Sequence, residues 1–230
     1  MHRLAAVLAA GLCLGGCADP SAGSNNDPYE NTNREVFAFN QRLDRIALRP
    51  AAERYVKYVP EGVRDSIRNA LGNLDTPAIF ANDMLQGRGK DAGATMGRFL
   101  LNSTFGVAGL FDVGAHVGIA AHHSDFGQTL AVWGVEDGPY MMMPMLGPMA
   151  PRDGTGQIVD FAMDPMLYIA IPGHYYWIFA RKYVSIVDTR ARNLEALDEI
   201  ERDSLDFYAA TRSLYRQYRE NEIRNGTPPP

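Results

Sequence analysis

The segment GATMGRFLLNSTFGVAGLFDVGAHVGIAA, residues 93–121, is almost free of charge, since only Arg98 and Asp112 interrupt it. It is long enough to cross a bilayer as a helix, for which about 20 apolar residues suffice. The two charges, Asn102 and the repeated glycines argue against an ordinary single span. Small residues permit close contact between helices in lipid. We therefore expect a pair of short helices that lie within one leaflet or pack on neighbouring helices.

Two runs with apolar residues at helical spacing, 36–46 and 63–74, precede this segment and predict amphipathic helices. Thr32 and Glu35, three residues apart, fit a capping box at the start of the first helix. Pro50 should end that helix or begin another, because proline cannot donate a backbone hydrogen bond within a helix.

The second helix is expected to begin at Pro60, since proline suits a first helical turn. The triplet Asp75-Thr76-Pro77 predicts a break in the chain and a restart. A short apolar helix should follow and end at Gly87.

The stretch GPYMMMPMLGPMAPRDG, residues 138–154, holds five methionines and four prolines. Neither a long helix nor a central strand can run through that many prolines. Methionine adapts to irregular apolar partners, so the stretch is either a surface touched by acyl chains or a buried core loop. Directly before it, residues 129–135 have the composition of a strand.

Residues 161–179 are apolar and aromatic, as at a membrane interface, but Pro165 and Pro172 divide them. Between residues 184 and 224 the character changes, because apolar residues recur roughly helically among dense charges. This region predicts one or two water-exposed helices that pack on the rest of the chain.

The N-terminus has the features of a secretory signal: a basic residue, a short apolar run and the sequence LGGC at residues 14–17. LGGC resembles a bacterial lipobox, which predicts that Cys17 is lipidated; an ordinary signal peptide is the alternative. Ala18, rather than aspartate, follows the cysteine, which favours delivery to the outer membrane. The expected divisions are a signal peptide (1–16), a lipidated tether (17–26), one domain (27–224) and a disordered tail (225–230).

The charge balance narrows the choice of partners. The chain holds 22 Lys and Arg against 27 Asp and Glu, a net charge of −5, and loss of the signal peptide removes one more basic residue. This acidic balance argues against a nucleic-acid partner. Cys17 would be the only cysteine left, so no internal disulfide is expected.

The residues give little support for an enzyme. The densest group of candidate ligands is HHSD, residues 122–125, but adjacent histidines point in different directions, so a polar loop is favoured over a zinc site. The chain contains neither a Gly-x-Ser-x-Gly elbow nor a His-Glu-x-x-His motif. We expect no catalytic residue, metal or cofactor. Arg152 begins the sequence Arg-Asp-Gly, which is either a capped turn or a contact to a lipid phosphate.

Several motifs recur in the order typical of one family. They are DPYE (27–30), VFAFN (36–40), LQG (85–87), GLFD (109–112), DFGQTL (125–130), GPY (138–140) and PRDG (151–154). From residue 27 to about 224 the chain resembles the MlaA/VacJ outer-membrane lipoproteins. The run of methionines replaces the Val and Leu residues more usual there, which puts the lipid preference in doubt more than the function.

This resemblance implies an all-α, ring-like bundle of Pro- and Gly-broken helices embedded in one membrane leaflet, with a charged helical C-terminal region. The strand composition of residues 129–135 then gives way to helix, because backbone groups in hydrocarbon must bond internally. The ring would hold an amphipathic channel that removes misplaced phospholipid from the outer leaflet.

The partners implied are a trimeric porin and a soluble periplasmic carrier. A structural porin-associated scaffold without transport is the alternative. The candidates for lining the channel or contacting lipid, each of which could instead brace the fold, are Asn40, Gln86, Arg98, Asn102, Gln128 and Arg152.

Overall fold

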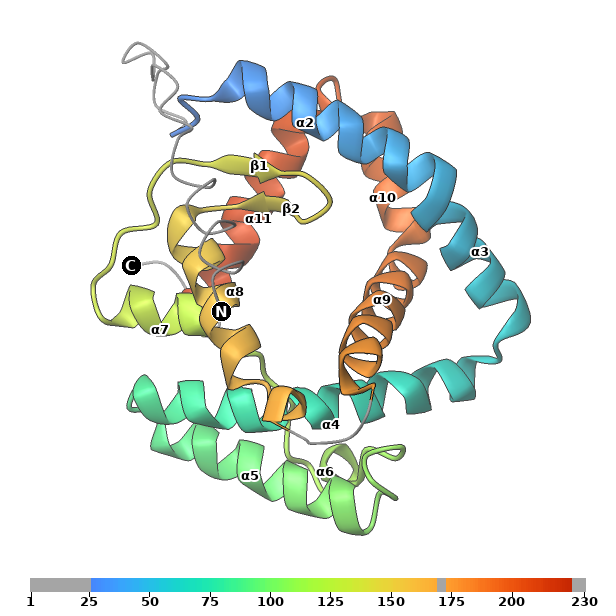
Figure 1. The fold of residues 1–230 in the computed structure, drawn as a ribbon, viewed down its shortest axis with the longest axis vertical. Helices are drawn as coiled ribbons and strands as arrows, with labels where there is room; N and C mark the ends of the chain where they lie inside the picture. Colours follow the sequence, from blue (N-terminus) through green and yellow to red (C-terminus); the bar gives the residue numbers. More distant parts are fainter. Residues whose placement is uncertain (1–25, 169–172, 225–230) are drawn as a thin grey trace.

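The computed structural model describes residues 26–168 and 173–224. The predicted signal peptide, Cys17, nearly all of the tether and the C-terminal tail lie outside the described residues. Figure 1 shows the helices arranged in a ring, with the chain's middle segment along its lower side.

The first side of the ring is one continuous helical stretch made of α2 (Glu30–Leu43), the π-helical turn η2 (Asp44–Leu48) and α3 (Arg49–Tyr58). Pro50 lies in the first turn of α3, but the helical stretch runs on through η2 into α3, so Pro50 neither ends the first helix nor begins a separate one. The predicted capping box is wrong. The Asn33 amide already donates to the Tyr29 carbonyl at 2.9 Å, so the helix starts early and Thr32 lies inside it.

The next side is α4 (Glu61–Leu85), a single helix of 25 residues that Pro60 precedes. The break predicted at Pro77 is wrong, because α4 continues through this proline. Packing of α5 along α4 outweighs the one backbone hydrogen bond that proline removes. Gly87, at φ 72°, follows the end of the helix as expected.

The weakly charged segment folds back outside α4 as α5 (Gly89–Thr104) and the short α6 (Val113–His116) (Figure 1). The expectation of a helix pair is confirmed. Among the described residues, no helix combines the length and the apolar character needed to cross a bilayer.

The strand composition of residues 129–135 was misleading, since α7 (Phe126–Val132) covers most of this stretch. The Asp125 side chain caps the helix by accepting from the Gln128 amide at 2.8 Å, and Gly134, at φ 87°, follows its end. A side-chain cap stabilises a helix start by about 1 kcal/mol, which is enough to override a weak strand preference.

The methionine-rich stretch forms an antiparallel hairpin of β1 (Met141–Met143) and β2 (Gly147–Met149), with Met142 opposite Pro148. The stretch divides into buried and exposed residues, and contact of the exposed ones with acyl chains stays a prediction. Met142 and Met149 are buried, whereas Met145 in the turn is 74% exposed. The strands are short and stand alone, as the prolines require.

The ring closes through α8 (Pro151–Met163), the 3₁₀ turn η3 (Pro165–Tyr168), α9 (His174–Arg192), α10 (Leu194–Asp203) and α11 (Phe207–Ile223). Residues 184–224 thus contribute to three helices instead of the expected one or two. The helical stretch is interrupted at Asn193 and again before Asp206. The Asp206 side chain accepts a hydrogen bond from the Ala209 backbone amide and so caps the start of α11.

The buried residues are mostly polar. A small apolar cluster joins Tyr140 and Met142 to Tyr208 on α11, but the buried set of the described chain holds 18 polar or charged residues and 10 apolar ones. Conversely, many large apolar side chains are exposed. Ion pairs and hydrogen bonds therefore do much of the work of joining the helices, and the apolar surface is left for contacts outside the chain.

Candidate functional site

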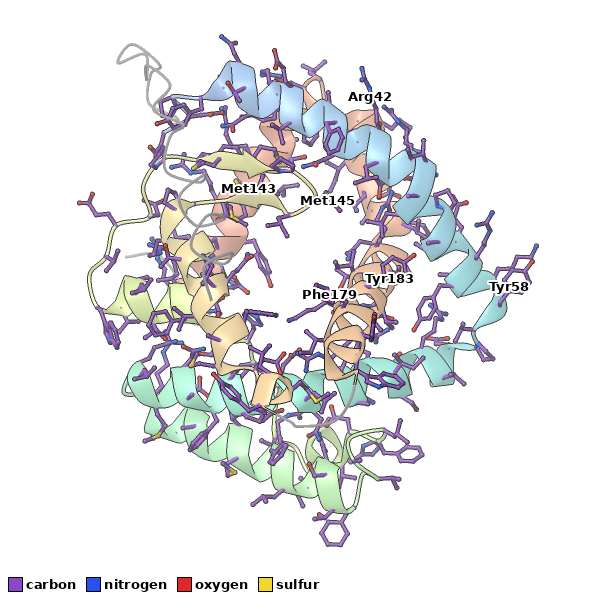
Figure 2. All side chains as sticks on the ribbon, in the orientation of Figure 1. Arg42, Tyr58, Met143, Met145, Phe179 and Tyr183 are labelled. Carbon is purple, nitrogen blue, oxygen red and sulfur yellow. The ribbon has the colours of Figure 1, made fainter. Side chains whose placement is uncertain are left out.

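The candidate site is the inner face of the ring. Figure 2 shows Met143 and Met145 on the hairpin and Phe179 and Tyr183 on α9, on opposite sides of the ring's centre, whereas Tyr58 points outward. Phe179 is 71% exposed and Met145 74%. Side chains that point inward and stay this exposed show that the centre is not a packed core.

Asn40, on α2, holds the hairpin that borders the centre. Its Nδ2 donates to the Met143 carbonyl at 3.0 Å and its Oδ1 accepts from the Met145 amide at 2.8 Å. Met145 has a φ of 65°, which a residue with a side chain adopts only when its surroundings hold it there. Asn40 therefore fixes the turn that presents Met145.

Gln86, at the end of α4, joins that helix to α7. Its Nε2 donates to Ser124 Oγ at 2.9 Å and to Thr129 Oγ1 at 3.0 Å. The Thr129 hydroxyl also lies 2.9 Å from Asn82 Oδ1, so α4 and α7 share a continuous chain of buried hydrogen bonds. Gln128, fully buried on α7, contacts His123 and Asp125 instead.

Arg98 and Asn102, both on α5, meet at Asp112. Arg98 Nη2 donates to the two carboxylate oxygens of Asp112 at 2.9 and 2.7 Å, and Asn102 Nδ2 donates to one of them at 3.1 Å. Burial would raise the pKa of Asp112, but the hydrogen bonds from Arg98 and from the Ala115 amide outweigh it and lower that pKa below its usual value. The group closes the loop between α5 and α6.

Arg152 is buried in the first turn of α8, where its Nε lies 3.2 Å from Asp153 Oδ1. Its Nη1 reaches the Val135 carbonyl at 3.4 Å. Asp153 is also held by Arg219, at 2.9 Å, and by the Tyr215 hydroxyl, at 2.7 Å. The Arg-Asp-Gly sequence is thus a salt-bridged helix start.

The structure gives all six polar candidates from the sequence partners within the fold. Arg98 and Asn102 come together at one carboxylate, and Gln86 and Gln128 lie in neighbouring networks between α4 and α7. Arg152 is linked to the network of Gln128 through Asp153 and Arg219, whereas Asn40 stands apart. Whether any of them also contacts lipid stays a prediction. Cys17 lies outside the described residues.

The sequence pointed to the methionine-rich stretch, but it did not single out Phe179 and Tyr183 as side chains at the centre of the ring. Phe179 and Tyr183 are one helical turn apart on α9, and this spacing was the available signal. The centre presents exposed thioether and aromatic groups, which suit hydrocarbon chains through dispersion and apolar burial.

Comparison with known proteins supports a single assignment. The family model described as MlaA lipoprotein matches residues 25–222. The Intermembrane phospholipid transport system lipoprotein MlaA of Escherichia coli K12 is 32% identical over 97% of this chain and 89% of its own length. The protein of that name from Haemophilus influenzae is also 32% identical, over 97% and 90%.

A protein of Rickettsia bellii is 36% identical over 86% of this chain and 77% of its own length. A solved structure, from work on the structural basis for maintenance of bacterial outer membrane lipid asymmetry, superposes with a TM-score of 0.77. It is 32% identical in sequence, and the match covers 86% of this chain and 98% of the other.

Proposed function

The chain belongs to the MlaA lipoprotein family, and from this membership and the geometry of the ring we propose that it carries phospholipid out of the outer leaflet of the outer membrane. In this proposal the lipid passes through the ring's centre toward the periplasm. No covalent bond of the lipid is made or broken.

The observation that carries the proposal is the exposure of Phe179 and Met145 toward the centre (Figure 2). Each methylene group of an acyl chain that leaves water is stabilised by about 0.8 kcal/mol. An acyl chain at the centre of the ring would cover the apolar side chains that the fold leaves exposed there. The six polar candidates then act by holding the ring in shape, while lipid contacts fall to the residues at the centre.

The outer surface supports a position in one leaflet. Beyond the end of α5, and around α6, Phe105, Val107, Phe111 and Val117 are all more than half exposed. An exposed apolar group of this size on a soluble surface would favour aggregation. Acyl tails would solvate it, so this part of the ring is proposed to lie in hydrocarbon.

The anchor and the partners belong to the same proposal. A lipidated Cys17 would tether the ring to the inner leaflet of the outer membrane. A trimeric porin beside the ring and a soluble periplasmic carrier would supply the two ends of the route. The competing proposal is a structural scaffold that binds a porin and moves no lipid.

The test compares two charged substitutions at equally exposed aromatic residues. Phe179 and Tyr58 are each 71% exposed, but Phe179 points to the centre and Tyr58 away from it. Aspartate is chosen because its negative charge repels lipid phosphate and its short side chain keeps that charge at the substituted position. Phe179→Asp should cause phospholipid to accumulate in the outer leaflet of cells, and Tyr58→Asp should not.

Both variants must reach the outer membrane at normal levels for the comparison to count. If Phe179→Asp is delivered normally and the outer leaflet still contains no excess phospholipid, transport through the centre is wrong. The scaffold is favoured if deletion of the gene causes a defect that neither Phe179→Asp nor Tyr58→Asp reproduces.

A further inference from the structure

Three side chains that commonly bind metals meet where α11 ends beside the loop before α7. His123 Nδ1 lies 3.3 Å from Glu222 Oε1 and 3.7 Å from Asp125 Oδ2. One ligand atom from each residue lies within 4.8 Å of the other two. Four ligand atoms at Zn²⁺ bond lengths of about 2.0–2.2 Å, in a tetrahedron, are roughly 3.3–3.6 Å from one another. We propose that His123, Asp125 and Glu222 form a Zn²⁺ site.

Both carboxylates are already oriented by other groups. Arg219 donates to Glu222 Oε2 at 3.0 Å, which leaves Glu222 Oε1 facing His123. Asp125 Oδ1 accepts hydrogen bonds from the backbone amide of Gln128 at 2.8 Å and from Arg219 Nη2 at 2.8 Å. Ligating carboxylates in metal sites are usually held by such outer hydrogen bonds.

The side chain of Gln128 lies against two of the three candidate ligands. Its side chain is fully buried, and its Oε1 has no hydrogen-bond partner among the described residues. The other end of the same amide, Nε2, lies 3.3 Å from both His123 Nδ1 and Asp125 Oδ2. Nε2 is therefore the end of the side chain that faces the candidate ligands, and the three protein ligands would leave the fourth position of the ion open to water.

The local charge also favours a cation. The carboxylates of Asp125, Asp153 and Glu222 share two guanidinium groups, those of Arg152 and Arg219. Three negative charges against two leave one negative charge for His123 or a bound cation to balance. On metal binding Asp125 Oδ2 would exchange the contact from Arg219 Nη1, at 2.6 Å, for the metal. Arg219 Nη2 would keep its contacts with Asp125 Oδ1 and Asp153.

The donor set selects the class of ion. An imidazole nitrogen with carboxylate oxygens suits Zn²⁺ better than Ca²⁺ or Mg²⁺, which prefer oxygen alone. The ion would join the last turn of α11 to the start of α7, two segments far apart in the sequence. This inference goes beyond the proposed transport function and does not depend on it.

The site is tested by titrating Zn²⁺ into the purified full chain, without a polyhistidine tag, in detergent and a buffer that does not bind metals. Isothermal titration calorimetry should give one Zn²⁺ per chain. Zn²⁺ at about a hundredfold excess over the dissociation constant should raise the melting temperature by about 5–10 °C, and EDTA should reverse the shift.

Two variants and two matched controls locate the ion. His123→Ala and Glu222→Gln should weaken Zn²⁺ binding by at least about tenfold. His116→Ala, on α6, and Glu220→Gln, one half-turn before Glu222 on α11, should bind as the parent chain does. If His123→Ala does not fold, Glu222→Gln decides, because it keeps the size of the side chain.

The proposal is overturned if Zn²⁺ does not bind the parent chain saturably. It is also overturned if Glu222→Gln binds Zn²⁺ as tightly as Glu220→Gln does, because the ion then lies elsewhere. X-ray absorption at the zinc edge should show nitrogen and oxygen ligands at about 2.0–2.1 Å, including one imidazole. A spectrum without an imidazole contribution would contradict the assignment of His123.

Discussion

Replacement of Asp112 by alanine should destabilise the ring more than any change on its surface. The Asp112 carboxylate accepts two hydrogen bonds from Arg98, one from Asn102 and one from the Ala115 amide. Its loss leaves the Arg98 side chain, only 13% exposed, without its counter-charge.

The magnitude follows from these contacts. Breaking a buried ion pair costs about 3–5 kcal/mol, and the lower value applies because the Asp112 side chain keeps 26% of its exposure. Loss of the helix cap at Ala115 adds about 1 kcal/mol. The sum of about 4 kcal/mol corresponds to a melting temperature lower by about 8–16 °C for a domain of this size.

The assay is tryptophan fluorescence during thermal unfolding of the purified chain in detergent, with a double-mutant cycle. Arg98→Met alone leaves Asp112 partly exposed, and the double variant removes both charges. We expect the sum of the two single losses in stability to exceed the loss of the double variant by about 1.5 kcal/mol or more. If the single effects simply add, Arg98 and Asp112 do not stabilise each other and this part of the account fails.

Three further predictions concern the hairpin, the pH dependence of stability and a close contact between helices. Asn40→Ala removes both hydrogen bonds to the hairpin turn. Hydrogen exchange of the turn amides should therefore become at least about tenfold faster, which corresponds to about 1.4 kcal/mol or more. Unchanged exchange would show that the turn is stable without Asn40. The hydrogen bond from Arg34 lowers the pKa of Asp206 to about 2; this pair therefore stabilises the fold above about pH 4 and loses its effect as the pH falls toward 2. Because both side chains are about 40% exposed, the pair contributes under about 1 kcal/mol of stability. The difference in melting temperature between the parent chain and Arg34→Gln should therefore shrink as the pH is lowered, and a difference that stays constant with pH would contradict this role. A Cβ at Gly156 would lie 2.3 Å from a backbone nitrogen of α7, whereas one at Gly72 meets nothing within 4 Å. Gly156→Ala should thus fail to fold or lose more than about 3 kcal/mol of stability, while Gly72→Ala should gain up to about 1 kcal/mol of stability. Equal melting temperatures for the two variants would contradict the packing of α7 on α8.

The sequence, with the family resemblance, was sufficient for the helical class and for a few element starts and ends. Apolar spacing located α2 and α4, and Gly87 marked the end of α4. Local rules failed where tertiary contacts outweighed them. α4 passes through Pro77 because α5 packs along it, and Thr32 does not cap a helix that has already started at Glu30.

The site could be predicted only in part, for a physical reason. The types of the polar candidates were visible, but the partner of a glutamine such as Gln86 is decided by α7, a different helix. Glu222 could not be connected with His123 because about a hundred residues separate them in the chain. The α9 stripe of Phe179 and Tyr183 was equally ambiguous, since apolar spacing is the same whether a helix faces a packed core or an open centre.

The central claim is that phospholipid occupies the centre of the ring, and native mass spectrometry of the purified chain tests it most directly. The parent chain and Tyr58→Asp should each retain phospholipid after detergent exchange, and Phe179→Asp should retain little or none. Equal retention by all three, or none by the parent chain, would contradict the account.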